Sequence, residues 1–350
     1  MFLCDWRKEI LKIFCKKLSS FKYRNLMYRM ARYIDIKENS ILKLDSMLLE
    51  ILLADKTTGK NILWCTDNYE SLGPSYQYNA QIYPELITGP NGNVIRSRVA
   101  KTLEEQTIRV RDKAEVFTPS WICNAQNNLV DEAWFGRKNV FNREIKNNWV
   151  VNSRKISFPE GKTWQDYVAA NRLEISCGEA PYIASRYDTI TGKSIPLKRR
   201  IGILDRKLRV VSENTSTQTE WREFALIALK STYGFEWQGD NLLLARENLL
   251  FTYIDYFKAK FGKASRLSDL FPVVEVIAWN IWQMDGIKCV VPYTCHDEVI
   301  IKEDLLEKKK YTVPCRGCAQ NDIKQHNGIY CYIMDWKAGK RRKFVTLLKK

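Results

Sequence analysis

The stretch Leu173-Glu-Ile-Ser-Cys-Gly-Glu-Ala-Pro-Tyr182 decides the fold class. Its apolar start predicts a short strand, and Ser176, Cys177 and Gly178 predict a tight turn that leads into a helix. Glycine at such a corner lets the backbone approach a ligand without an intervening side chain. Corners of this kind with a single glycine are common, so the stretch alone is compatible with either a plain corner or a nucleotide-binding one.

The sequence around this corner predicts three regions. Residues 111–290 alternate short apolar strand-like segments with longer helical ones, the order that builds a mostly parallel sheet covered by helices. Residues 1–110 are expected to form a helical and mixed extension, with basic amphipathic helices over 5–35. Residues 291–350 predict a small basic β unit that contains cysteines. The expected fold class is therefore α/β with an N-terminal extension and a small C-terminal unit.

Composition indicates an ordered protein that binds a polyanion. The 350 residues include 56 Lys and Arg against 40 Asp and Glu, a net charge of +16, which suits a nucleic acid better than an acidic membrane surface. We find no apolar run of about 18 residues and no signal-peptide core, so we expect a cytoplasmic protein without a membrane partner. Its ten cysteines should then be reduced, as core residues or metal ligands.

A segment upstream of the corner predicts the start of a helix. In Lys113-Ala-Glu-Val-Phe-Thr-Pro-Ser-Trp121, Pro119 can occupy the first helical turn and Thr118 can cap it, which leaves Phe117 exposed at the corner. A capped helix start of this kind is also common without any ligand.

A segment downstream predicts a second strand that ends in an acid. Thr232-Tyr-Gly-Phe-Glu-Trp-Gln238 is strand-like up to Glu236, and helical spacing follows from Asp240. An acid at the carboxyl end of the second strand is where such sheets hold ribose hydroxyls. Asp205 is a rival, but Leu204, Leu208 and Val211 around it fit one face of a helix, so we interpret residues 188–230 as an insertion that carries this helix.

Together the three segments resemble amino-methylating, adenine-specific DNA methyltransferases, especially the modification subunits of restriction systems, over roughly residues 60–285. The resemblance implies a Rossmann-like sheet that binds S-adenosylmethionine. Glu115-Val-Phe-Thr-Pro119 matches the N-terminal cofactor motif of the family, which implies that Phe117, Thr118 and Pro119 lie against the methionine part of the cofactor.

The same resemblance assigns the other cofactor residues. Glu174-Ile-Ser-Cys-Gly178 matches the first motif, with alanine in place of its second glycine, and Glu236 with Trp237 matches the second motif. This implies that the carboxylate binds the ribose and that the indole packs on the adenine. The turn residues assigned to the cofactor are Ser176, Cys177, Gly178, Glu179 and Ala180.

The catalytic position departs from the family. Methylation of an exocyclic amine needs a polar acceptor and an aromatic face for the displaced base, which the family supplies in an Asn-Pro-Pro-Tyr or Asp-Pro-Pro-Tyr tetrapeptide. Neither occurs here, and the nearest equivalent is the strand-like run Val274-Glu-Val-Ile-Ala-Trp-Asn-Ile-Trp-Gln283. Asn280 would supply the amide oxygen and Trp282 the stacking surface, without the stiffening prolines. The alternative makes this run part of the core.

The cysteines near the C-terminus indicate a metal site. Val313-Pro-Cys-Arg-Gly-Cys-Ala319 places Cys315 and Cys318 around a glycine, the geometry of a zinc knuckle. His326 and Cys331 could complete a tetrahedral set for structural zinc, and Cys295 with His296 offers substitutes. The alternative is a set of reduced cysteines in a small β unit.

Three functions remain open on these grounds. The first is an S-adenosylmethionine-dependent methyltransferase that acts on adenine in DNA, with a nuclease or specificity subunit as a further partner. The second is a catalytically silent methyltransferase-like subunit that retains cofactor or DNA binding. The third is a zinc-knuckle nucleic-acid binder that lacks cofactor affinity.

Overall fold

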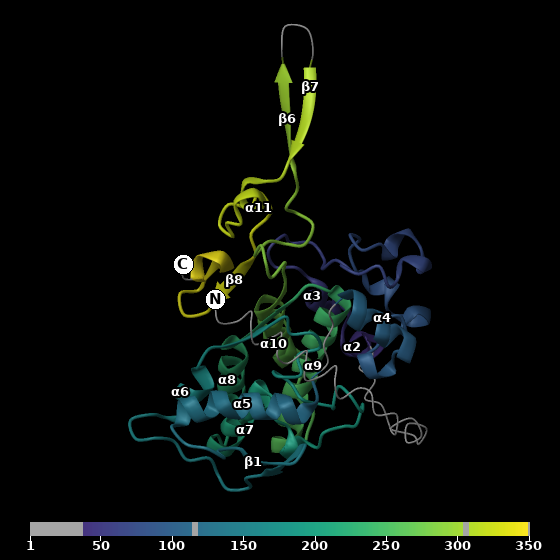
Figure 1. Cartoon of the computed structure of the whole chain (residues 1–350). Coiled ribbons are helices and arrows are strands. Elements are labelled where there is room, and N and C mark those ends of the chain that lie inside the picture. Colours follow the sequence, from purple (N-terminus) through teal and green to yellow (C-terminus); the bar gives the residue numbers. More distant parts are fainter. Residues whose placement is uncertain (1–37, 114–117, 304–307, 349–350) are drawn as a thin grey trace. The chain divides into compact units, whose positions relative to one another are not determined.

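The computed structural model of the chain describes residues 38–113, 118–303 and 308–348, and these described residues belong to one compact unit (Figure 1). The interpretation of residues 5–35 and the assignment of Phe117 therefore lie outside the described residues. Among the described helices, none combines the length and the apolar character that crossing a lipid bilayer requires.

A three-stranded parallel sheet organises the fold. Its strands are β3 (Arg172–Ile175), β4 (Thr232–Glu236) and β5 (Ile281–Gln283), in the order β3-β4-β5. Arg172 pairs with Thr232, and Gly234 pairs with Ile281. Because the strands are parallel, their carboxyl ends share one edge, which we call the carboxyl edge. The prediction of a mixed α/β fold with a parallel sheet is confirmed.

Helices pack around this sheet and form the main hydrophobic core. The longest, α9 (Gly239–Phe261), starts just after β4 and is buried along most of its length. Trp221 of α8 (Gln218–Lys230) packs on it, with its ring centroid 5.2 Å from that of Tyr253 and 5.4 Å from that of Phe257. The other helices of this region are α5 (Ser120–Phe135), α6 (Trp164–Ala169), α7 (Ile203–Asn214), α8 (Gln218–Lys230) and α10 (Leu267–Asn280). Strands β1 (Asn142–Ile145) and β2 (Asn148–Val151) form a separate antiparallel pair.

The N-terminal part of the described chain packs against the same core. Asp45 caps α3 by accepting a hydrogen bond from the Met47 amide, and the leucines of this helix are buried. The helices are α2 (Glu38–Leu44), α3 (Ser46–Leu53) and α4 (Leu103–Lys113), with short 3-10 helices η2 (Glu70–Leu72), η3 (Pro74–Tyr76), η4 (Pro84–Leu86), η5 (Gly89–Asn91) and η6 (Arg98–Ala100) between them.

The C-terminal segment contributes a second core on β4 and β5. Phe235 and Trp282 pack there with Phe344, whose ring centroid lies 5.2 Å from that of Trp282. The elements are the hairpin β6 (Glu298–Glu303) and β7 (Lys308–Val313), the helix α11 (Arg316–Gln320), the pair β8 (Tyr332–Asp335) and β9 (Lys340–Lys343), and η8 (Phe344–Leu347) (Figure 1). The four basic residues of β9 are all exposed.

Three local predictions are wrong, and one is confirmed. The turn at Gly178 does not lead into a helix, because turns and the short η7 (Leu197–Arg199) fill the chain up to α7. Thr118 does not cap α5, whose N-cap residue is Pro119. The apolar run that ends at Asn280 is helical, and the strand begins only after it. The expected helix with Leu204, Leu208 and Val211 on its buried face is α7.

Candidate cofactor edge and metal centre

The corner after β3 meets the end of β4 at the carboxyl edge. Ser176, Gly178 and Ala180 have φ angles of 52°, 55° and 60°, so every second residue here has the left-handed conformation that suits glycine best. The Gly178 amide donates a 2.8 Å hydrogen bond to Oε2 of Glu236, whose Oε1 accepts a 3.1 Å bond from the Gln238 amide. The acid of the second strand therefore lies directly against the glycine turn of the first.

Trp237 lies next to Glu236 and is half-buried. Its Nε1 donates a 3.1 Å hydrogen bond to the carbonyl of Cys65, and Nε2 of Gln283 donates to both the Trp237 carbonyl (2.8 Å) and the Cys65 sulfur (3.3 Å). Burial, and then the nearby carboxylates of Glu236 and Asp240, raise the pKa of the Cys65 thiol far above its usual value. This cysteine is consequently a neutral, buried residue beside Trp237.

The start of α5 lies beside the loop that follows the glycine turn. The Ser120 amide donates to Oδ2 of Asp188 (3.1 Å), and the Thr189 hydroxyl donates to the Thr118 carbonyl (2.9 Å). From the next turns of α5, Asn127 donates to the carbonyl of Tyr182 at 2.9 Å. Thr118 and Pro119 therefore lie close to the segment that continues from Gly178, although Phe117 itself is not described.

The turn residues differ in what they offer to a ligand. Cys177, Glu179 and Ala180 are buried, whereas Ser176 is exposed and Gly178 is half-buried. The Glu179 carboxylate accepts hydrogen bonds from the Arg98 amide at 2.6 Å and from the Tyr187 hydroxyl. Burial is the main reason that the pKa of the Cys177 thiol is raised. Only the backbone around Ser176 and Gly178 could approach a ligand directly.

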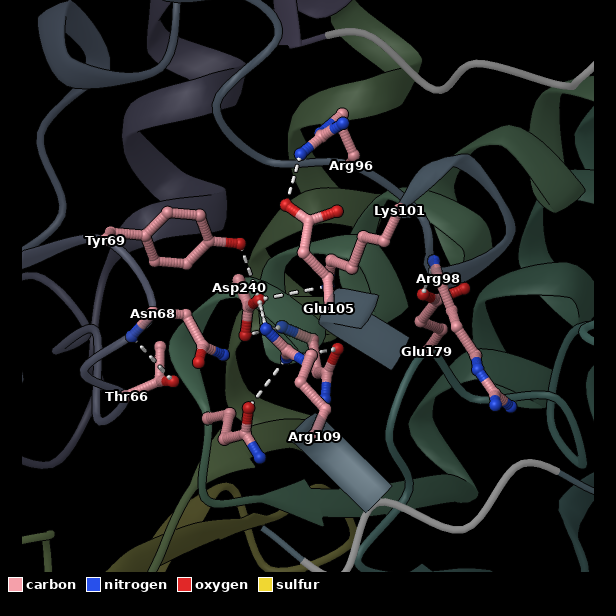
Figure 2. Close-up of polar contacts among 12 residues, drawn as sticks. Thr66, Asn68, Tyr69, Arg96, Arg98, Lys101, Glu105, Arg109, Glu179 and Asp240 are labelled. Atoms are coloured by element: carbon pink, nitrogen blue, oxygen red, sulfur yellow. Dashed lines mark hydrogen bonds and ion pairs between the residues drawn. The ribbon is translucent and has the colours of Figure 1, made fainter. Parts of the chain in front are cut away.

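A buried charge cluster ties residues 60–113 to this edge. Figure 2 shows Tyr69, Lys101 and Arg109 directed at Asp240, which lies in the first turn of α9. The Asp240 carboxylate is 2.8 Å from the Tyr69 hydroxyl, 2.9 Å from a guanidinium nitrogen of Arg109 and 3.3 Å from the Lys101 ammonium. Burial alone would raise the pKa of Asp240, but the two cations hold it well below its usual value. The cluster fixes the loops around the edge.

The residues predicted to be catalytic lie elsewhere. Asn280 is the last residue of α10 and precedes β5, at the end of the sheet opposite to the carboxyl edge. Its amide group donates to the carbonyls of Leu229 (2.9 Å) and Thr232 (3.1 Å), and its oxygen accepts from Nε1 of Trp336 (2.8 Å). Trp282 lies within β5 and is 2% exposed in the second core. The structure therefore does not bring this pair to Gly178 and Glu236.

Four side chains near the C-terminus form a group that could hold a metal ion. Cys295, Cys315, Cys318 and His326 have ligand atoms that all lie within 4.8 Å of one another. The Cys295 sulfur is 3.4 Å from that of Cys315 and 3.8 Å from that of Cys318, and Nδ1 of His326 is 3.6–3.7 Å from all three sulfurs. A tetrahedral zinc site has about 3.8 Å between two sulfurs and about 3.6 Å between sulfur and nitrogen. The donor set fits such an ion.

The fourth ligand of this group is Cys295, one of the substitutes, and not Cys331. The Cys331 thiol is buried in the second core and lies 3.4 Å from the Gln283 carbonyl. Cys295 joins the group because β6 and β7 pair with Glu298 opposite Val313, which brings the residues before and after the hairpin together. The register of this strand pair, which the sequence alone does not show, is what separates Cys295 from the other candidates.

Local backbone geometry shapes this centre. Cys315 is the N-cap of α11, and its sulfur accepts a 3.4 Å hydrogen bond from the Cys318 amide. Burial would raise the pKa of the Cys315 thiol, but hydrogen bonds from the backbone of Cys318 and Asn327 and from His326 lower it to about 6. A Cβ atom at Gly317 would lie 2.6 Å from Nδ1 of His326, so only glycine allows this approach.

Comparison of the chain with protein-family models, with curated proteins and with solved structures gives no match. The interpretation of both sites therefore depends on their own geometry.

Proposed function

We propose that this chain binds S-adenosylmethionine at the carboxyl edge and is a methyltransferase for the exocyclic amine of adenine in DNA, as the modification component of a restriction system. The observation that carries the proposal is the 2.8 Å hydrogen bond between the Gly178 amide and Glu236. A glycine turn and a carboxylate on adjacent parallel strands are the two parts that nucleotide-type cofactors require. The excess of basic residues, 56 against 40, supports a polyanionic substrate.

The residues at this edge suit the chemistry of the cofactor. Glu236 offers carboxylate oxygens to a ribose diol, Trp237 offers an indole face to an adenine ring, and the Gly178 backbone offers close approach without a side chain. Bound S-adenosylmethionine would supply an electrophilic methyl group. Thr118 and Pro119, beside the loop that continues from the turn, support the assignment of the methionine part to that side.

The metal in this proposal is zinc, with a structural role. Three thiolates and one imidazole complete a tetrahedral shell, so that no position stays open for a substrate. Metal analysis of the purified protein should give one zinc ion per chain. Cys318→Ser should lose it, whereas the matched control Cys331→Ser, outside the group, should retain it. Absence of zinc from the wild type would overturn the assignment.

A second candidate is the silent cofactor-binding and DNA-binding subunit, and the position of Asn280 favours it. Its amide oxygen accepts from Trp336 and its nitrogen donates to two carbonyls, so both ends of the amide are already engaged away from the carboxyl edge. An active enzyme would then need another polar acceptor. The two candidates share the cofactor site and differ in methyl transfer.

Calorimetric titration with S-adenosylhomocysteine tests the shared site. Removing a charged hydrogen-bond partner removes about 1.5–3 kcal/mol, so Glu236→Ala should weaken binding about 10- to 100-fold. Glu144→Ala, on the exposed strand β1, is the matched control and should bind as the wild type does. Equal affinity in Glu236→Ala and the wild type would remove Glu236 from the site and the proposal with it.

Transfer of a tritiated methyl group to unmethylated DNA separates the two candidates. Tritium in the DNA after incubation with the wild type shows that the chain is a methyltransferase. Absence of tritium across varied DNA substrates, with cofactor binding intact, shows that it is the silent subunit. Loss of methyl transfer in Asn280→Ala assigns the reaction to Asn280 only if the variant is still folded and binds S-adenosylhomocysteine as the wild type does. Retained methyl transfer would place the catalytic group elsewhere.

A further inference from the structure

Three aromatic rings gather in an exposed position beside the proposed cofactor site. The ring centroid of Tyr293 lies 5.3 Å from that of Trp237 and 5.0 Å from that of Tyr78, with interplanar angles of 73° and 63°. Tyr78 is 44% exposed and Tyr293 is 46% exposed. We call these three residues the aromatic ledge. Because two of its rings are nearly half exposed to solvent, burial in a core does not account for the ledge.

The backbone of Tyr293 is unusual for a residue of its size. Its φ angle is 62°, in the left-handed region that favours glycine, where a bulky side chain costs about 1–2 kcal/mol. Two hydrogen bonds stabilise the turn that contains Tyr293. The Thr294 amide and hydroxyl both donate to the Val291 carbonyl, at 3.2 and 2.7 Å. Thr294 leads directly to Cys295 of the metal centre. A strained backbone that presents an exposed ring points to a role for that ring.

Hydrogen bonds join the ledge to the carboxyl edge. The Cys65 amide donates to the Tyr78 carbonyl at 2.7 Å, and the Cys65 carbonyl accepts from Nε1 of Trp237 at 3.1 Å. Trp237 in turn directly follows Glu236 in the chain. The three rings thus have defined positions relative to the glycine turn, although Tyr78 and Tyr293 lie more than 200 residues apart in the sequence.

We propose that the aromatic ledge is a stacking site for one planar purine ring. Tyr293 is the residue that gives this site its preference for a base that is not stacked within a duplex. This inference rests on the proposed function, because Trp237 belongs to both sites. Aromatic side chains stack on bases through their ring faces, with about 1–3 kcal/mol per base. The purine has two possible sources, the adenine of the cofactor and an adenine of DNA that has left the duplex stack.

The test uses a 12-nucleotide single strand of deoxyadenosine and a strand of equal length and charge that lacks its bases. We expect the wild-type chain to bind the adenine strand roughly 5- to 100-fold more tightly than the abasic strand. Tyr293→Gly should remove this preference while its thermal midpoint stays near that of the wild type, since glycine relieves the φ strain that the ring imposes. Tyr293→Phe should keep the preference. Tyr83→Gly, at an exposed tyrosine outside the ledge, is the matched control.

Titration with S-adenosylhomocysteine distinguishes the two sources. Loss of strand preference in Tyr293→Gly with unchanged cofactor affinity assigns the ledge to the DNA base, and loss of cofactor affinity assigns it to the cofactor adenine. If the wild type binds the adenine and abasic strands equally and Tyr293→Gly has unchanged cofactor affinity, the aromatic ledge is not a purine-stacking site. If the wild type does not bind the cofactor but still prefers the adenine strand, the proposed cofactor site is refuted and the stacking role of the ledge is retained.

Discussion

Replacing Asp240 by asparagine should destabilise the protein strongly. The Asp240 side chain is fully buried, and the Lys101 and Arg109 side chains are 5% and 2% exposed, so the variant leaves two cations without their carboxylate in a region that excludes water. Breaking a buried ion pair from one side typically costs about 3–5 kcal/mol, because the remaining charge keeps its desolvation penalty. We expect a loss of that size in the free energy of unfolding.

Urea unfolding at pH 7, followed by tryptophan fluorescence, measures this loss. Asp335→Asn is the matched control, since its partner Arg342 is 45% exposed and pairs of that kind contribute below about 1 kcal/mol. The double variant Asp240→Asn with Lys101→Met should cost less than the sum of the two single changes, because it removes one of the orphaned cations. Additive losses, or a loss in Asp240→Asn no larger than in the control, would refute the assignment of the cluster as a buried electrostatic anchor.

Three further predictions concern the metal centre, acid stability and the amide at the end of α10. Gly317→Ala should lower zinc stoichiometry in metal analysis, because the added Cβ lies 2.6 Å from the ring of His326; full occupancy would contradict the close approach. The pKa of Asp240 is lowered from 3.8 in the folded protein. The contribution of Asp240 to stability is therefore present above about pH 4 and is lost as the pH falls toward the folded pKa. Between pH 7 and pH 3, the free energy of unfolding measured in urea should fall more in the wild type than in Asp240→Asn. Asn280→Ala should reduce the free energy of unfolding by about 2–4 kcal/mol by leaving buried groups unpaired, and Trp336→Phe by about 1 kcal/mol; an unchanged unfolding energy in Asn280→Ala would contradict this structural role.

Local sequence signals predicted the centre of the fold well. Thr232–Glu236 is a strand and a helix follows it, because the strand has β-favouring residues and the helix has a long apolar repeat. The helical face with Leu208 and Val211 in the insertion was also correct. In each case one element is long or strongly patterned, so that local preference and tertiary packing agree.

Contacts between segments that are distant in the chain could not be predicted from local sequence signals. Cys295 enters the metal group only through the register of the hairpin, and Tyr78 meets Tyr293 only through the packed fold. Neither contact leaves a periodic pattern in the sequence. The prediction of Cys331 as a ligand relied on its closeness in the chain to Cys315 and Cys318, which says little once the residue before β8 packs into the second core.

One wrongly predicted element explains why Asn280 does not lie at the carboxyl edge, where the sequence predicted it. The run that ends at Asn280 is apolar on most sides, and such a run does not distinguish a buried helix from a buried strand. Taken as a strand, it places Asn280 at the carboxyl end, beside Gly178 and Glu236. As the end of α10 it places the same residue before the three-residue strand β5, about 10 Å along the sheet in the wrong direction. The proposed cofactor motifs do not depend on this assignment, since the strands that carry them, β3 and β4, both end at the carboxyl edge. Under the proposed function, the catalytic group for methyl transfer should therefore be sought among residues that follow β5, on the side of the aromatic ledge, and not at its start.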